Sequence, residues 1–179
     1  MASRPEALLA LGAFADLSAE DAAATSQRAT TVSLGPGERL FRTGDAADSF
    51  YILVAGEVDV VGETSAGAER LVTLNPGALL GELALLLESA RSATVLGRTE
   101  AELWRISRET FLGAVANGEP WASRLLLIAA RHLAGRLLAL DQQLLALIAR
   151  TRGEGAAPPS ARASELERLR EHLVSEWAF

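Results

Sequence analysis

The chain has 179 residues, 49% hydrophobic and 22% charged, and this length and composition suit a globular domain with appended segments rather than a disordered or fibrous chain. Its 17 Lys and Arg against 23 Asp and Glu give a net charge of -6, which disfavours long-range attraction to nucleic acid or to an anionic membrane. Because the sequence has no cysteine, disulfides, a thiol nucleophile and Cys-ligated metal sites are excluded.

The first 30 residues carry two helical patterns, PEALLALGAF and SAEDAAATSQRA. In the second pattern, Ser18 followed by Asp21 is typical of an N-cap with an acidic first turn. The N-terminal sequence has no sustained apolar core followed by a small-residue cleavage site. We therefore expect a small helical cover without a secretory signal, and a cytoplasmic protein.

Residues 30–106 change to short runs rich in Val, Ile, Leu and Thr, separated by turns that contain glycine. The candidate strands are TTVSL, RLFR, FYILVA, EVDVVGE, ERLVTL, SATVLGR and AELWRI. Closely spaced strands with such turns predict a mainly β fold with flanking helices, in the form of an antiparallel barrel or jelly roll.

The segment RETFLGAVANGEP predicts a short helix that ends at Asn117 and Gly118, and Pro120 opens the next helix. This long helix, to about Arg150, has polar interruptions at Arg131, His132, Arg136 and Asp141, which a membrane span would rarely accept. Its heptad seam consists of Leu126, Ala130, Leu133, Leu137, Leu140, Leu144 and Leu147. A second stripe includes Leu125, Ile128, Leu138, Leu145 and Ile148.

One of these stripes can pack on the barrel and the other on a second copy, so the seam predicts a homodimer. The alternative is a broad apolar face that is buried within one subunit. After the long helix, residues 151–163 predict a linker, and residues 164–179 predict an amphipathic helix that folds back or awaits a partner. The expected division is 1–118 for the N-terminal helices and β-roll, 119–150 for the long helix, 151–163 for the linker and 164–179 for the C-terminal amphipathic helix.

The segment GELALLLESARSATV, residues 81–95, combines residue types that suit a sugar phosphate. The planar guanidinium of Arg91 can bridge two oxygens of a phosphate diester, and the small residues Ser92 and Ala93 let a hydroxyl and backbone amides approach. Gly81 allows close backbone approach before a short helix that starts near Leu83.

Glu82 would be repelled by a bound phosphate unless a neutral group stands between them. A ribose hydroxyl is such a group, and a carboxylate on the ribose with an arginine on the phosphate indicates a compact, cyclic nucleotide. The alternative is a mutual ion pair between Glu82 and Arg91 within a turn.

GELALLLESARSATV resembles the phosphate-binding cassette of cyclic-nucleotide-binding domains, as in catabolite activators and regulatory subunits of cAMP-dependent kinase. PGERLFRTGDAADSFYILVAGEVDVV, NPGALLGELALL and AELWRISRETF extend the resemblance over roughly residues 14–150. It implies an eight-stranded jelly roll with flanking helices. It also implies that Glu82 holds the ribose 2'-hydroxyl, that Arg91, Ser92 and the Ala93 amide hold the phosphate, and that Gly81 and Leu83 form the cassette backbone and wall.

The match to the activators stops at the long helix, because the remaining linker and single helix are too short for a helix-turn-helix unit. We therefore expect no direct DNA binding, and output through a partner protein or a dimer change. The positions that match the base-reading residues of the activators are Arg136 and Leu137, which leaves cAMP and cGMP both open, with cAMP favoured by its prevalence in the family.

Three other functional classes are weighed against this hypothesis. An enzyme is disfavoured because no nucleophile, metal cluster or cofactor motif is evident, and His132 and His172 are far apart in sequence. A jelly-roll dimer that binds no nucleotide and acts as a scaffold remains the main alternative. An effector other than a cyclic nucleotide is the third, although relatives of that kind usually lose the glutamate or the arginine.

Overall fold

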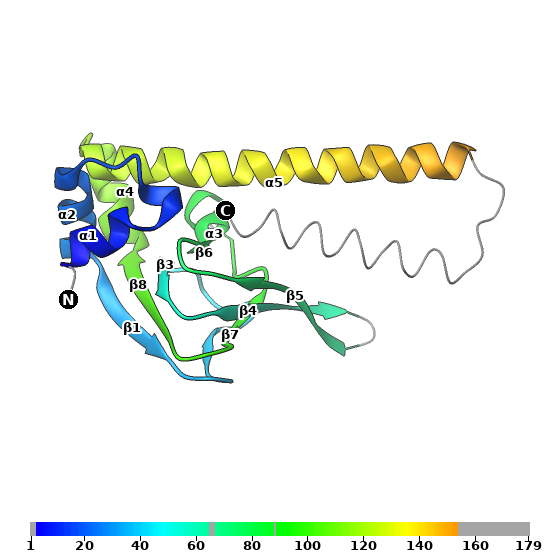
Figure 1. Cartoon of the computed structure of the whole chain (residues 1–179), viewed down its shortest axis with the longest axis horizontal. Coiled ribbons are helices and arrows are strands. Elements are labelled where there is room, and N and C mark those ends of the chain that lie inside the picture. Colours follow the sequence, from blue (N-terminus) through cyan, green and yellow to red (C-terminus); the bar gives the residue numbers. More distant parts are fainter. Residues whose placement is uncertain (1–2, 65–66, 88, 154–179) are drawn as a thin grey trace.

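The computed structural model describes residues 3–64, 67–87 and 89–153. Three short helical elements come first, namely α1 (Arg4–Leu9), the 3-10 helix η1 (Gly12–Phe14) and α2 (Ala19–Arg28). The first five strands follow as β1 (Thr30–Leu34), β2 (Arg39–Phe41), β3 (Ser49–Ala55), β4 (Val58–Thr64) and β5 (Gly67–Leu74). The remaining elements are β6 (Leu79–Leu80), α3 (Glu82–Leu87), β7 (Thr94–Gly97), β8 (Ala101–Ser107), α4 (Arg108–Ala116) and α5 (Pro120–Gly153) (Figure 1).

The strands form two four-stranded antiparallel sheets, with the orders β1-β8-β3-β6 and β2-β7-β4-β5. The helices flank this β body, and α5 runs along one side of it and continues past it (Figure 1). The mainly β, antiparallel class with flanking helices is therefore confirmed. The sequence did not predict β6, because the strand has only two residues and these directly follow the NPGA turn.

Strand β3 separates two parts of the core. Phe50 and Ile52 belong to a cluster with the helices, whereas Tyr51 and Leu53 belong to the cluster between the sheets. Successive side chains of a strand point to opposite faces. The strand is buried on both faces, and this explains why FYILVA is continuously apolar.

The helix boundaries follow the capping residues in the sequence. The Ser18 side chain accepts a hydrogen bond from the Asp21 amide at 3.0 Å, so the predicted N-cap of α2 is confirmed. Helix α4 ends at Ala116 before Asn117 and Gly118, and α5 begins at Pro120, as the sequence predicts. These residues fix where the long helix begins.

The two apolar stripes predicted for α5 do not behave as two continuous faces. Leu125 and Ile128 are buried, but Leu138 and Leu145 of the same predicted stripe are 59% and 66% exposed. Positions 125 and 138 lie 13 residues apart, which places them about 220° apart around the helix. The prediction of one continuous second stripe is therefore wrong.

The seam of α5 changes exposure along its length. Leu126 and Leu133 are partly buried, while Ala130, Leu137, Leu140, Leu144 and Leu147 are exposed in the isolated chain.

In the part of the chain that the structure describes, no helix is long and apolar enough to cross a membrane. Helix α5 continues to Gly153, three residues into the predicted linker 151–163. The rest of that linker and the predicted helix 164–179 lie outside the described residues.

Candidate ligand-binding site

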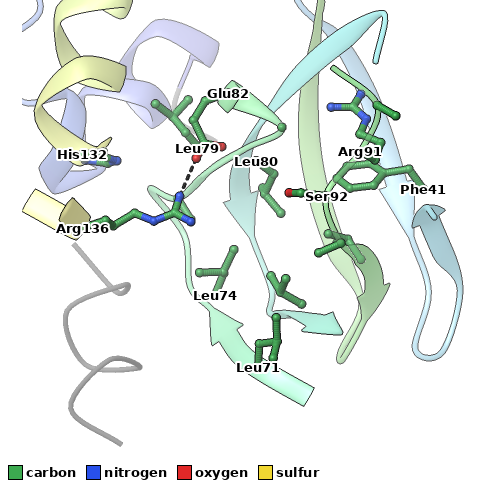
Figure 2. A pocket seen from close by; sticks show the side chains of 16 residues that line it. Phe41, Leu71, Leu74, Leu79, Leu80, Glu82, Arg91, Ser92, His132 and Arg136 are labelled. Atoms are coloured by element: carbon green, nitrogen blue, oxygen red, sulfur yellow. Dashed lines mark hydrogen bonds and ion pairs between the residues drawn. The ribbon is translucent and has the colours of Figure 1, made fainter. Parts of the chain in front are cut away.

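A pocket lies between the β body, α3 and α5 and has polar groups at opposite ends (Figure 2). Arg91 and Ser92 lie on the side of Phe41, whereas Glu82 faces His132 and Arg136 of α5. The wall between them is largely apolar and includes Val60, Leu71, Leu74, Ala78, Leu79, Leu80 and Val95. The pocket therefore suits a ligand with an anionic end and a separate polar group.

Arg91 is a buried cation, only 4% exposed. Its Nη2 atom donates to the Ser49 carbonyl oxygen at 2.6 Å, and its guanidinium carbon lies 4.3 Å from the centroid of the Phe41 ring. Among the described residues, Nε and Nη1 have no hydrogen-bond partner. Because buried donors cost free energy when unpaired, this guanidinium is suited to an acceptor supplied by an anion.

Burial lowers the pKa of Arg91 from its ordinary value. A guanidinium nevertheless stays protonated in proteins, because its intrinsic pKa is so high. The charge at this end of the pocket is therefore fixed.

A network of hydrogen bonds holds Ser49, the residue that accepts from Arg91, in place. The Ser49 hydroxyl donates to Asp48 Oδ1 at 2.8 Å and accepts from Arg105 Nε at 3.1 Å. Arg105 Nη2 also donates to Asp48 Oδ2 at 2.9 Å. The hydrogen bond from Ser49, with the charges of Arg105 and Arg91, lowers the pKa of Asp48.

The sequence-based reasoning did not find Phe41, Asp48, Ser49 or Arg105. Ser49 and Arg91 are 42 residues apart, and no local spacing connects them. The sequence gives one indication of the role of Ser49. Side chains alternate between the two faces of a strand, so Ser49 lies on the same side of β3 as Tyr51 and Leu53.

Gly81 is required by the position of Arg91. Its φ is +78°, a left-handed conformation that favours glycine. A Cβ atom at this position would also overlap Arg91 Nη1. The group that comes close to Gly81 is the arginine side chain, and the predicted close approach of this backbone to a ligand stays a prediction.

Glu82 lies at the other end of the pocket and is 6% exposed. Arg136 Nη1 of α5 donates to its Oε1 atom at 2.6 Å. The alternative of a mutual Glu82 and Arg91 pair therefore does not hold among the described residues. The carboxylate instead connects the start of α3 to the long helix.

His132 lies one turn before Arg136 on α5 and also lines the pocket (Figure 2). Burial is the main cause that lowers its pKa; the charge of Arg136 acts in the same direction, and that of Glu82 opposes it. The imidazole is therefore held in its neutral form at neutral pH. The sequence analysis noted His132 only as a polar interruption of the long helix. Its position four residues before Arg136 indicates that both side chains face the same way.

The remaining predicted site residues have three different outcomes. Ser92 and Ala93 line the same pocket as Arg91. Leu83 lies in α3, but its side chain is outside what the structure describes. Leu137 is 61% exposed and is not among the residues that line the pocket of this chain.

Comparison with known proteins identifies similar chains. The model of the cyclic nucleotide-binding domain matches residues 31–117. A cAMP-dependent protein kinase regulatory subunit from Eremothecium gossypii is 36% identical over 82 residues, which cover 46% of this chain and 17% of that subunit. The chain thus spans a small part of that relative's length.

Two solved structures are also similar. A cyclic nucleotide-binding-like protein from Brucella abortus is 31% identical, with a TM-score of 0.53, over 63% of this chain and 97% of that one. The regulatory domain of Toxoplasma gondii PKA, solved with cAMP, is 26% identical, with a TM-score of 0.55, over 62% of this chain and 42% of that one.

Proposed function

The chain belongs to the cyclic nucleotide-binding domain family, and from this premise we propose that it is a non-enzymatic regulatory protein that senses cAMP. The names of the Eremothecium and Toxoplasma relatives support cAMP, and cGMP is the alternative. The strand orders support an interpretation of the two sheets as a jelly roll. We further propose a cytoplasmic location and no direct contact with DNA.

The observation that carries the proposal is the buried Arg91, whose Nε and Nη1 atoms have no partner among the described residues. In the proposed complex these donors bind the cyclic phosphate, together with the Ser92 hydroxyl and the Ala93 amide. Gly81 leaves room for the guanidinium in this position.

The ribose 2'-hydroxyl is proposed to bind Glu82. It would compete with Arg136, which already donates to Oε1 of that carboxylate. Binding would thereby weaken the connection between α3 and α5 or shift it. A ligand changes a conformational equilibrium only when it binds one arrangement better, and the shared carboxylate supplies such a difference.

Arg136 and Leu137 are the proposed base contacts. Arg136 can donate to guanine O6 and N7 or stack on either base. Leu137 is exposed in the isolated chain, so its contact to a base would be made across the interface of the proposed homodimer. That interface is the seam of α5. An unidentified protein partner would recognise the movement of α5 that follows ligand binding.

The direct test is calorimetric titration of ligand-stripped protein with cAMP and with cGMP, repeated with Arg91→Ala. Removing one side of a buried charge pair costs about 2–5 kcal/mol, or roughly 30-fold to several thousandfold in affinity. Arg70→Ala is the matched control, because Arg70 lies in the sheet that contains β7 but its side chain is 50% exposed.

Micromolar or tighter binding that Arg91→Ala largely abolishes and Arg70→Ala retains would support the proposal and identify the base. If folded protein binds neither nucleotide, the proposal fails. The exposed leucines of α5 would then favour a dimeric scaffold.

A further inference from the structure

The C-terminal half of α5 exposes a wider apolar arc than one packed face requires. The large apolar side chains of this half are all at least 36% exposed; they are Leu137, Leu138, Leu140, Leu144, Leu145, Leu147 and Ile148. At about 100° per residue, these positions cover about 180° of the helix circumference. A helix that packs on one partner needs an apolar stripe of about 100°. The arc therefore provides two adjacent faces.

The first face is the seam, with Leu137, Leu140, Leu144 and Leu147. The second face, called the flank stripe, consists of Leu138, Leu145 and Ile148, and its centre lies about 100° further around the helix. Assigning the seam to a second copy rests on the proposed function. Leu138 and Leu145 lie at least about 80° from every seam leucine, so they stay exposed when the seam packs on a second copy.

We propose that residues 164–179 of the same chain pack on the flank stripe, antiparallel to α5. These residues lie outside the described part of the chain. Their sequence, SELERLREHLVSEWAF, places Leu166, Leu169, Leu173 and Trp177 at helical spacing. As a helix, the run from Leu166 to Trp177 would be about 16 Å long, and the run from Leu138 to Ile148 is about 15 Å long.

The connection between the two segments is long enough for this return. Helix α5 is described to Gly153, and the sequence EGAAPPSARA, residues 154–163, separates it from the segment. Ten residues reach at most about 33 Å, whereas the axes of packed helices lie about 10 Å apart. The flank stripe is therefore within reach of the chain's own C-terminal segment.

The charges of the two segments are complementary. Helix α5 carries one acidic residue against five arginines, a net charge of +4, from Asp141 and from Arg124, Arg131, Arg136, Arg150 and Arg152. Residues 164–179 carry two arginines against four glutamates, a net charge of -2. In the antiparallel arrangement, Glu165 and Glu167 come near the basic end of α5. The opposite net charges of the two segments favour the pairing.

The first test is a disulfide formed in the full-length chain, which has no native cysteine. With Leu166 opposite Ile148, Leu169 lies opposite Leu145, so Leu145→Cys with Leu169→Cys should form an intrachain disulfide under mild oxidation. Leu127→Cys with Leu169→Cys is the control. Leu127 is 47% exposed and lies on the same side of α5 as Leu145, about 27 Å along the axis.

Intrachain cross-linking of the Leu145 pair, without cross-linking of the Leu127 pair, is the expected result. Equal cross-linking of both pairs, or none, would overturn the proposal. Covalent dimers would also overturn it, because they would place the segment on a second copy. Non-reducing electrophoresis and intact mass distinguish these outcomes.

A second test uses the fluorescence of Trp177. The other two tryptophans, Trp104 and Trp121, are 1% and 2% exposed, so acrylamide quenching reports mainly on Trp177. Leu145→Glu should increase this quenching, and Leu127→Glu should leave it unchanged. If quenching of the unmodified protein already equals that of Leu145→Glu, the segment is not packed there. The same variants can be titrated with cAMP, so failure of this proposal can be distinguished from failure of the proposed nucleotide binding.

Discussion

At the scale of single residues, Gly81 combines two constraints that can be separated by mutation. Gly81→Ala would place a Cβ in a left-handed conformation and into Arg91 Nη1. Gly118 has a similar φ of +70°, but a Cβ there meets nothing within 4 Å. Both variants should lose about 1 kcal/mol of folding free energy to the backbone conformation, measured by urea unfolding.

Only Gly81→Ala should also weaken cAMP binding, because only this change displaces the guanidinium. Calorimetry on the two variants decides the point. Equal affinity in Gly81→Ala and Gly118→Ala would contradict the proposed role of Arg91.

His132 predicts a pH dependence of stability. Burial holds its folded-state pKa below the ordinary value of 6.5, so the unfolded state binds the proton more readily. Stability should therefore be fully retained above about pH 6.5 and should fall as the pH drops from there toward the folded pKa. The neighbouring charges are Glu82 of α3 and Arg136 of α5, which act in opposite directions.

Urea unfolding at about pH 5.5 and 7.5 measures this dependence. His132→Gln should show a smaller loss of stability between the two pH values than the unmodified protein. An unchanged loss in His132→Gln would assign the effect to other groups.

The residues of the pocket differ in how far the sequence could identify them. Arg91 and Glu82 could be found because a cation and an acid stood in one short apolar segment. Ser49 and Arg105 could not, since their contacts join residues 42 to 57 positions apart and depend on the pairing of β3 with β8. The partner of Glu82, Arg136, was found as a residue of interest but not as a contact, for the same reason.

At the scale of elements, the strands were predictable where they were long and alternating or continuously apolar. Strand β3 is an example, because burial on both faces leaves an uninterrupted apolar run. The stripes of α5 were less predictable. A stripe is continuous only when its members fall at similar angles around the helix, and a separation of 13 residues corresponds to about 220°. Leu125 and Leu138 were grouped together and lie on different faces.

The contact between α3 and α5 depends on the Glu82 and Arg136 pair. Its side chains are 8% and 28% exposed, and their hydrogen bond is 2.6 Å long. A double-mutant cycle with Glu82→Gln and Arg136→Gln should give a coupling free energy of about 1–3 kcal/mol in the absence of nucleotide.

Denaturant unfolding with saturating cAMP should give a smaller coupling, because the ribose hydroxyl shares the carboxylate. Additive single-mutant effects in the free protein would show that the pair does not connect the two helices. A coupling that cAMP leaves unchanged would instead remove the proposed competition at Glu82.

At the scale of the whole molecule, the exposed leucines of α5 predict a homodimer. Figure 1 shows the helix continuing past the β body, and Leu140 and Leu144 of the seam are 51% and 55% exposed there. Burying a leucine side chain contributes about 1.5–3 kcal/mol. In a two-fold symmetric dimer each position is buried twice, so a single seam substitution acts at two sites.

Leu144→Asp should therefore convert the dimer to a monomer over the micromolar range, as measured by sedimentation equilibrium. Leu127→Asp is the matched control, since Leu127 is similarly exposed, at 47%, but lies outside the seam. If both variants remain dimeric, the seam is not the interface. If Leu144→Asp is monomeric and still binds cAMP as tightly as the unmodified protein, dimerisation is real, and Leu137 does not reach the base of a nucleotide bound to the other copy.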